Sequence, residues 1–523
     1  MKNIRAANII LGIVVLLTLM MGILVLCNPP SFFPDPSHGF QVMRSMQLDG
    51  PFNIFISPDQ DDISKNTSLY LTWWSPGQYL VPMFFQSVFG INTGHAAALT
   101  VLLFELSGLF GFYYFFKKIG FTPMIAALSL VFIICQQAFI LPFAFYNGGE
   151  VLLFGFEGWF LYGCMAIDKP GLKMLLFVLL SGWLGFLFKS SFIWIYAAGL
   201  MCLWLRLSSI AAKPNMQKLV KYGGWIAIPA VISLVCIYVF FLSKGVNPAS
   251  GASRLNISWE NFTFPIGSPL LSGFSVDDLA RGLLFHPVGS LLSPVMALVV
   301  LALSAIVSLA LVWAVIRYVP KNNYRLFLIV FYTIAVLFFT VAFMHQSSIS
   351  YESRHFRIIG LLIIPGVIYL FSRLKPVFKG LLIVVCMATA TVNYAFLIKC
   401  YTFNKNVSAH GNSGMAQEYI DQPSLNYIMQ LDRQNRNAIF AFISSDLGLE
   451  IKYNRVITLD IPPSVNGINY DDYAYDGHAG PLYLVLPAAY NAVSDTMFTK
   501  FFPGYSNFTE KNLSKGYVLF EAK

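Results

Sequence analysis

The sequence predicts a polytopic all-α membrane protein that ends in a small α/β domain, and three observations support this prediction. Of the 523 residues, 57% are hydrophobic and 11% are charged, and the mean hydropathy is +0.65. Apolar runs close to the roughly 20 residues that a spanning helix needs recur between residues 7 and 399. From Tyr401 to Lys523 the pattern changes to short strand-like runs. This composition excludes a water-soluble globular protein of the same length.

The N-terminal segment is interpreted as an uncleaved membrane anchor. Lys2 and Arg5 precede an apolar run from Ala7 to Cys27, which is long enough to span a bilayer. A cleaved signal peptide is the alternative, but the Asn-Pro-Pro that follows Cys27 lacks a small-x-small cleavage site. A long polar loop, residues 28–77, comes next. The apolar stretch after it, residues 78–90, is too short to span, so we expect an interfacial helix there.

Ten further spans are expected after this loop, which makes about eleven transmembrane helices with the first one. Their approximate bounds are 95–116, 121–142, 149–167, 173–188, 191–206, 223–243, 287–316, 325–344, 357–372 and 378–398. The seven cysteines all lie inside or at the edges of spans. Their spacing therefore predicts neither a disulfide framework nor a metal site.

The basic residues predict a cytoplasmic N-terminus. With that orientation, the cytoplasmic segments hold 16 Lys and Arg in 51 residues, whereas the opposite loops hold 8 in 117. These opposite loops are 28–77, 143–150, 188–190, 244–286 and 345–357. An excess of Lys and Arg marks the cytoplasmic side of a membrane protein. We therefore expect an integral protein of the inner or plasma membrane whose C-terminal domain is extracytoplasmic.

The predicted transmembrane domain comprises residues 1–400, including the loop 28–77. The predicted extracytoplasmic α/β domain comprises residues 401–523. A helix is expected to begin near Asp421, where Gln-Pro-Ser follows. Four strand-like runs are found at 438–444, 455–459, 482–487 and 517–521.

Asp35 is the first acidic residue after the first span. A carboxylate near the membrane surface can accept a proton from an attacking hydroxyl or amine. The structural alternative is a solvated Asp-Pro turn, because Asp favours turns. His38 is a candidate second acid-base group, and its alternative is a contact with lipid headgroups.

Other acidic residues allow further interpretations. The run Asp59-Gln60-Asp61-Asp62 allows a divalent-metal site, because hard cations favour clustered carboxylates. We interpret it as a solvated turn, because no neighbouring residue completes a ligand set. Glu105 and Glu157 lie within predicted spans, where ionisable groups are usually functional or paired.

The polar loop carries an ordered set of residues. Arg44 lies nine residues after Asp35. Gly50 follows, and Trp74-Ser75-Pro76 opens the next helix. This order resembles the first extracytoplasmic loop of GT-C fold glycosyltransferases that use polyprenyl-phosphate-linked sugars, such as protein O-mannosyltransferases and aminoarabinose transferases. The family has a second acid after the first, and Pro36 takes that position here.

Three later segments continue the resemblance, which covers about the first 370 residues. Asn147-Gly148-Gly149-Glu150 opens a span, and Phe188-Lys189 ends a later one in an aromatic-Lys pair. The segment Tyr351-Glu352-Ser353-Arg354-His355-Phe356 is similar to the family's late loop before a Pro-containing helix.

The resemblance implies an inverting membrane glycosyltransferase in which Asp35 is the general base. Lys189, Arg354 and Arg44 would bind the donor phosphate and stabilise it as the leaving group. The alternative for each cation is that it extends to the lipid headgroups. Candidate additional site residues are His38, Glu150 and His355.

The implied partners are a polyprenyl-phosphate-linked sugar, membrane lipids and a glycan, lipid or protein acceptor, with no nucleic acid. No cofactor is implied with certainty, although a divalent metal stays open. Two other functions also stay open, namely a lipid or polysaccharide transporter and a ligase or polymerase of surface glycans. A transporter needs access from both sides of the membrane, whereas an enzyme needs an acidic group and cations on one face. The charge distribution favours the enzyme.

Overall fold

The computed structural model describes residues 2–32, 34–209, 216–245, 255–280, 282–284, 291–347, 349–418, 420–459, 468, 473–514 and 516–523. The chain divides into two compact units. Unit 1 comprises Met1–Gly22, Val101–Pro142 and Gly149–Leu397, and unit 2 comprises Ile23–Thr100, Phe143–Gly148 and Ile398–Lys523.

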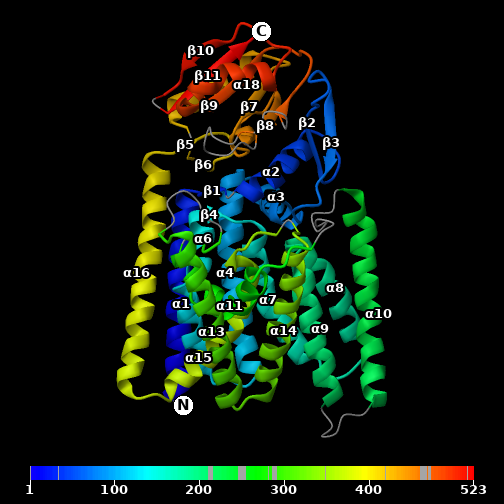
Figure 1. The fold of residues 1–523 in the computed structure, drawn as a ribbon, viewed down its shortest axis with the longest axis vertical. Helices are drawn as coiled ribbons and strands as arrows, with labels where there is room; N and C mark the ends of the chain where they lie inside the picture. The colour runs from blue at the N-terminus through cyan, green and yellow to red at the C-terminus, as the bar shows by residue number, and fades with distance from the viewer. Residues whose placement is uncertain are drawn as a thin grey trace. The chain divides into compact units, whose positions relative to one another are not determined.

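Unit 1 is helical (Figure 1). The helices that lie in it, wholly or for most of their length, are α1 (Lys2–Cys27), α4 (Thr93–Lys118), α5 (Pro123–Ile134), α6 (Gln137–Ala144), α7 (Gly149–Ala166), α8 (Leu172–Phe188), α9 (Phe192–Ser209), α10 (Met216–Phe240), η1 (Leu242–Lys244), α11 (Glu260–Gly273), α12 (Val276–Leu279), α13 (Pro294–Tyr318), α14 (Asn322–Met344), η2 (Ser353–Phe356), α15 (Arg357–Ser372) and α16 (Pro376–Asn406).

The apolar helices make this chain an integral membrane protein. Among the described residues, seven helices are long and apolar enough to cross a membrane, or eight if the bent pair α5 and α6 is one span. Helices α8 and α9 are apolar but shorter. The count of about eleven spans therefore stays a prediction, although a helix lies at each of the eleven expected positions.

The span expected at 121–142 is broken, and its two halves meet at an angle of 50°. The break leaves backbone carbonyls without a partner in the helix, which is costly in an apolar environment. Two side chains of α16 supply the missing hydrogen-bond donors. Asn393 Nδ2 donates to the carbonyl of Cys135 at 2.8 Å, and the Tyr394 hydroxyl donates to the carbonyl of Ile134 at 3.4 Å. The bend is thus supported by specific hydrogen bonds.

Helix α11 lies within 244–286, one of the loops that the sequence analysis places opposite the cytoplasm and for which it predicts no helix. The helix contains two prolines, Pro265 and Pro269. Proline interrupts helical hydrogen bonding, so the sequence does not predict a helix here. The Ser308 side chain on α13 accepts from the amide of Leu270 at 3.1 Å and donates to the carbonyl of Gly267 at 3.0 Å. Ser308 thus supplies tertiary hydrogen bonds to the α11 backbone on either side of Pro269.

Unit 2 combines a five-stranded sheet with the segment that follows the first helix. Its elements are β1 (Ser31–Phe32), α2 (Pro34–Gln47), β2 (Ile54–Pro58), β3 (Asn66–Tyr70), α3 (Gly77–Phe89), β4 (Phe145–Tyr146), β5 (Ala409–His410), β6 (Ala416–Gln417), α17 (Gln422–Gln434), β7 (Ile439–Phe442), η3 (Leu447–Glu450), β8 (Arg455–Thr458), β9 (Leu482–Pro487), η5 (Ala488–Val493), α18 (Ser494–Phe501), β10 (Thr509–Asn512) and β11 (Tyr517–Ala522). The expected interfacial segment 78–90 is the helix α3.

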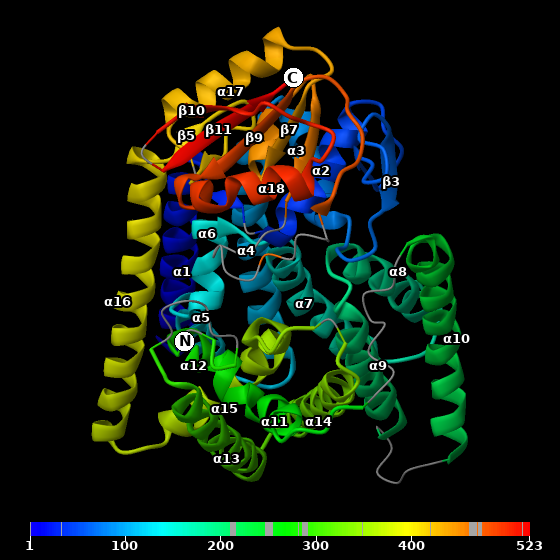
Figure 2. The same cartoon turned by 45° about the horizontal axis from the view of Figure 1, so that its top comes forward.

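The five-stranded sheet has the order β10-β11-β9-β7-β8. Strand β7 is parallel to both of its neighbours, with Ile439 opposite Arg455 on β8 and Leu482 on β9. Alternate residues of β7 face two separate cores, one with α18 and one with α17. Figure 2 shows these two helices on opposite faces of the sheet. The small α/β region predicted after residue 400 is therefore present, and its four predicted strands are confirmed.

The polar loop 28–77 is ordered within unit 2. Strand β1 pairs in parallel with β4, with Ser31 opposite Phe145. Strands β2 and β3 form an antiparallel hairpin. Between β1 and this hairpin lies α2, which contains Asp35 in its first turn. The first loop and the C-terminal sheet thus belong to one unit.

Candidate functional site

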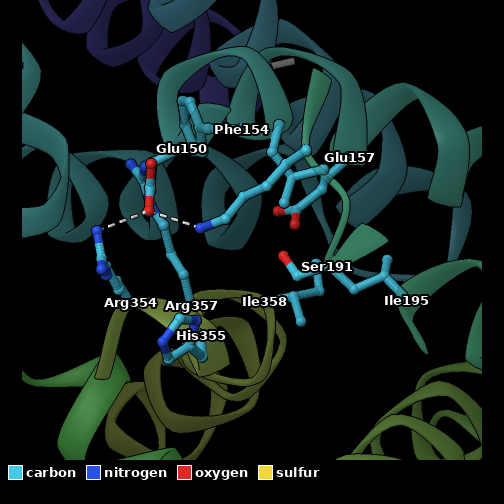
Figure 3. Close-up of a pocket in the computed structure, with 11 residues that line it drawn as sticks. Glu150, Phe154, Glu157, Ser191, Ile195, Arg354, His355, Arg357 and Ile358 are labelled. Atoms are coloured by element: carbon cyan, nitrogen blue, oxygen red, sulfur yellow. Dashed lines mark hydrogen bonds and ion pairs between the residues drawn. The ribbon is translucent and has the colours of Figure 1, made fainter. Parts of the chain in front are cut away.

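A small charged cavity of about 10 Å³ lies in unit 1, which is room for about one water molecule (Figure 3). Three segments form it: helix α7, the turn between α8 and α9 with the first turn of α9, and η2 with the start of α15. The residues that line it are Glu150, Leu153, Phe154, Glu157, Lys189, Ser191, Ile195, Arg354, His355, Arg357 and Ile358. Four residues that the sequence analysis selected, Glu150, Lys189, Arg354 and His355, therefore line one cavity.

Glu150 lies between two cations of this cavity. Its Oε1 accepts a hydrogen bond from Lys189 Nζ at 2.6 Å and another from Arg354 Nη1 at 3.3 Å. The exposed fractions of the side chains are 13% for Glu150, 16% for Lys189 and 29% for Arg354. One carboxylate oxygen thus bridges two partly buried cations, and a dashed line in Figure 3 marks its contact with Arg354.

The local sequence explains how Glu150 and Lys189 meet. Glu150 lies in the first turn of α7, and Lys189 is the C-cap of α8. The residue before Glu150 is Gly149, and a Cβ there would lie 2.9 Å from the carbonyl oxygen of Phe188. Glycine therefore permits the close approach of the two helix ends.

Arg354 is held in η2 by contacts that the sequence analysis missed. Its Nε forms an ion pair with Glu352. Asp277 Oδ2 accepts from the amide of Ser353 at 2.9 Å, and Asp277 Oδ1 accepts from the amide of Leu283 at 2.9 Å. Asp277 is buried and fastens the first residue of η2. Burial raises the pKa of Asp277, and the two amide donors oppose that rise.

Arg357 and Glu157 are further charged residues of the cavity lining. Arg357 Nη2 lies 4.0 Å from Glu105 Oε1, and its guanidinium stacks over the Phe154 ring at 4.3 Å. Glu157 lines the same cavity and is 2% exposed. The cavity lining thus contains three cations, Lys189, Arg354 and Arg357, and two carboxylates. Two further carboxylates, Glu105 and Glu352, pair with Arg357 and Arg354 from outside the lining.

His355 is enclosed beside these groups. Its Nε2 lies 3.4 Å from Ser350 Oγ, and its ring lies 6.0 Å from that of Phe339. It therefore lines the cavity while its Nε2 lies beside a hydroxyl and its ring lies beside an aromatic residue.

Three selected residues lie in unit 2, on α2. Asp35 is half-buried in the first turn of the helix. His38 stacks on Trp74, with ring centroids 5.1 Å apart and planes 2° apart. Arg44 donates from Nε to the carbonyl of Ile451 and from Nη2 to that of Asn454, both at 2.7 Å. Burial lowers the pKa of Arg44 to about 10, although the charge of Asp432 opposes this effect.

The run Asp59–Asp62 forms local turn contacts. Asp59 accepts from the amide of Asp61 at 2.9 Å, and Asp62 pairs with Lys65 at 3.0 Å. Within the ranges that the structure describes, no group of three or more His, Cys, Asp or Glu residues is placed to hold a metal ion. These contacts agree with the interpretation of a solvated turn.

Comparison with known proteins identifies a fold but no sequence relative. No family model matches the chain, and no curated protein matches it. The structure is similar to that of ArnT from Cupriavidus metallidurans bound to undecaprenyl phosphate, with a TM-score of 0.54, 13% identity and coverage of 98% of this chain and 97% of the other. The apo state of the same protein gives a TM-score of 0.53, 14% identity and coverage of 99% and 98%. The chain thus shares the fold of ArnT over nearly its whole length, which confirms the predicted resemblance at the level of the fold.

Proposed function

We propose that this protein is an integral-membrane glycosyltransferase that moves a sugar from a polyprenyl-phosphate donor to an extracytoplasmic acceptor. The observation that carries the proposal is the cation pair, Lys189 and Arg354, in one cavity of a chain whose whole length shares the fold of ArnT. The ArnT structure contains undecaprenyl phosphate. The acceptor class, whether a glycan, a lipid or a protein, is left open.

The cation pair suits a phosphate. Arg binds phosphate through two parallel hydrogen bonds, and Lys adds a compact positive charge. Both cations pair with the Glu150 carboxylate, an anion with two acceptor oxygens, and Arg354 pairs with Glu352 as well. A donor phosphate can take the same place, because it offers the same charge and acceptors to Lys189 and Arg354.

Asp35 is the proposed general base. It would take the proton from the acceptor hydroxyl or amine while the acceptor atom bonds to the anomeric carbon. The bond from that carbon to the phosphate oxygen breaks, and its electron pair leaves with the phosphate, which the cations stabilise. A single displacement of this kind inverts the anomeric configuration. Asp35 lies in the first turn of α2.

The contacts of Arg44 are better explained by a structural role, in which it supports backbone carbonyls, than by phosphate binding. Its guanidinium already donates to two backbone carbonyls, of Ile451 and Asn454. Moving Arg44 to a phosphate would leave these carbonyls unpaired, which costs about 1–3 kcal/mol for each buried group. We therefore assign the donor phosphate to Lys189 and Arg354.

We also propose that the N-terminus is cytoplasmic and that the C-terminal domain is outside the cytoplasm. The bias of Lys and Arg between the two sets of loops supports this orientation. The donor would then be used on the outer face of the inner or plasma membrane.

The test is transfer by purified protein reconstituted in lipid, with a panel of undecaprenyl-phosphate-linked pentoses, hexoses and aminosugars. Asp35→Asn preserves the shape of the side chain but removes the base, so the rate should fall by about 10²- to 10⁴-fold. Asp49→Asn and Asp59→Asn, in the same loop, are the matched controls and should keep most of the activity. Wild-type turnover by folded Asp35→Asn protein would refute the base assignment. Movement of intact donor without any glycosylated product would instead favour a transporter.

A further inference from the structure

One face of α2 is hydrogen-bonded along its length to a single segment of the C-terminal domain. The side chains on this face belong to Ser37, Gln41 and Arg44, which are four and three residues apart. This spacing places all three on the same side of a helix. The face begins two residues after Asp35.

The partners of this face lie between Ser445 and Asn454. Ser37 Oγ forms a hydrogen bond with Ser445 Oγ, and Gln41 Nε2 donates to the carbonyl of Ser445 at 2.5 Å. Arg44 adds its two bonds to the carbonyls of Ile451 and Asn454. The segment 445–454 connects β7 to β8 and contains η3. We call it the clamp segment.

The clamp segment is fastened to the rest of its domain. Asn454 Oδ1 accepts from the amide of Ala438 at 2.9 Å, next to the central strand β7. Asn454 Nδ2 donates to Asp432 Oδ1 at 2.8 Å, and Asp432 Oδ2 accepts from the amide of Lys452 at 2.8 Å. The acceptors that face α2 are therefore fixed relative to the sheet and to α17.

The contact between the two surfaces is also close. A Cβ at Gly448 in the clamp segment would lie 2.3 Å from Gln41 Nε2 and 2.7 Å from Val456 Cγ1. The absence of a side chain at Gly448 leaves room for the Gln41 amide in the place where it reaches the Ser445 carbonyl. Directional hydrogen bonds at three levels fix both the rotation of α2 about its axis and its position along that axis.

We propose that the clamp segment positions α2 so that Asp35 is held in its reactive place. Gln41, Arg44 and Ser445 are then positioning residues for the proposed base, and the C-terminal domain is a required part of the enzyme. The inference rests on the proposed function. A displacement of a reacting group by about 1 Å can cost about 10²-fold in rate, so even small movements of α2 would be measurable.

The experiment compares Gln41→Ala with Gln47→Ala, which removes an exposed glutamine from the same helix. Both are made in the wild-type chain and in the Asp35→Asn chain, and kcat and KM are measured with a polyprenyl-phosphate sugar that the wild type uses. Gln41→Ala should lower kcat by about 10-fold or more in the wild-type background, with the donor KM changed by less than about 2-fold. In the Asp35→Asn background it should add little, because there is no base left to position. Gln47→Ala should be neutral in both.

A merely structural role for Gln41 gives a different result. The fraction of folded protein and its Tm would fall, but kcat per folded molecule would stay, or would fall equally in both backgrounds. Either outcome overturns the proposal. If Gln41→Ala has the wild-type kcat while Asp35→Asn is impaired, the positioning role of the clamp segment is overturned and the proposed base stands. If Asp35→Asn is active, both the proposed base and the positioning role are overturned.

A second variant guards against misfolding of Gln41→Ala. Gly448→Ala leaves α2 unchanged and pushes on the Gln41 amide from the clamp segment, so it should reproduce the fall in kcat and its absence in the Asp35→Asn background. Normal kcat in folded Gly448→Ala protein would also count against the clamp.

Discussion

Removal of the Glu150 charge should make the protein bind a phosphate more tightly. In the structure, one Glu150 oxygen occupies both Lys189 and Arg354. A phosphate that binds these cations must displace the carboxylate or lie beside it. Two like charges about 5 Å apart repel by about 3 kcal/mol at an effective dielectric constant of about 20. Glu150→Gln removes this repulsion, so the affinity for undecaprenyl phosphate should rise by up to roughly 100-fold.

The same substitution should destabilise the protein without ligand. It removes the carboxylate that pairs with Lys189 and leaves Arg354 with Glu352 alone, and breaking an ion pair costs up to about 3–5 kcal/mol when it is fully buried. The exposed fractions of 16% and 29% for the two cations place the expected loss at the lower end of that range or below it. A bound phosphate should then raise the Tm of Glu150→Gln by more than it raises the Tm of the wild type.

The assay is thermal unfolding in detergent across a titration of undecaprenyl phosphate, with dolichol as the phosphate-free control lipid. Glu260→Gln is the matched control variant, because Glu260 lies in the same unit at the start of α11 and does not line the cavity. Unchanged or weaker binding by folded Glu150→Gln would refute the idea that Glu150 and the phosphate compete for the two cations.

Two further predictions address other parts of the molecule. Arg354→Lys retains the charge but loses the paired hydrogen bonds of a guanidinium, so affinity for undecaprenyl phosphate should fall by about 10-fold; Arg317→Lys on α13 is the control, and an equal loss in both would contradict the assignment. Burial raises the pKa of Asp446 to about 7, from 3.8 in the unfolded chain. Backbone amides oppose this rise in pKa, and the charge of Glu450 adds to it. The folded state therefore favours the protonated acid, and the stability this group provides is full below about pH 4 and is lost as the pH rises through 7. Asp446→Asn should accordingly raise Tm relative to the wild type more at pH 8 than at pH 5, and an equal difference at both values would contradict the reasoning.

The helices were the most predictable part of the fold. The span expected at 95–116 is the helix Thr93–Lys118, and the one expected at 378–398 is Pro376–Asn406. A spanning helix needs a long apolar run, and such a run is visible without any knowledge of the tertiary structure. Helix α11 lacked this signal, because Pro265 and Pro269 interrupt its apolar run and its backbone exchanges hydrogen bonds with Ser308 on another helix.

The ion pairs of the cavity were less predictable than the residues themselves. Lys189 and Arg354 could be selected from motifs and from their place in the predicted topology. That Glu150 bridges them could not, because the partners lie 39 and 204 residues away from it in sequence. The role of Asp277 is similar, since the amide that it accepts from is 76 residues away. Pairing over such separations depends on how the helices are arranged.

Arg44 and Arg354 show where a motif stops being informative. Both were assigned to the donor phosphate by the same argument, yet one donates to backbone carbonyls and the other to carboxylates. A carboxylate can be exchanged for a phosphate, because both are mobile anions that accept paired hydrogen bonds. A backbone carbonyl in a fixed segment cannot move aside for a phosphate. It would also lose its own hydrogen bond if the arginine turned away. The acceptor that an arginine contacts, which only the folded structure supplies, therefore separates an anion site from a structural support.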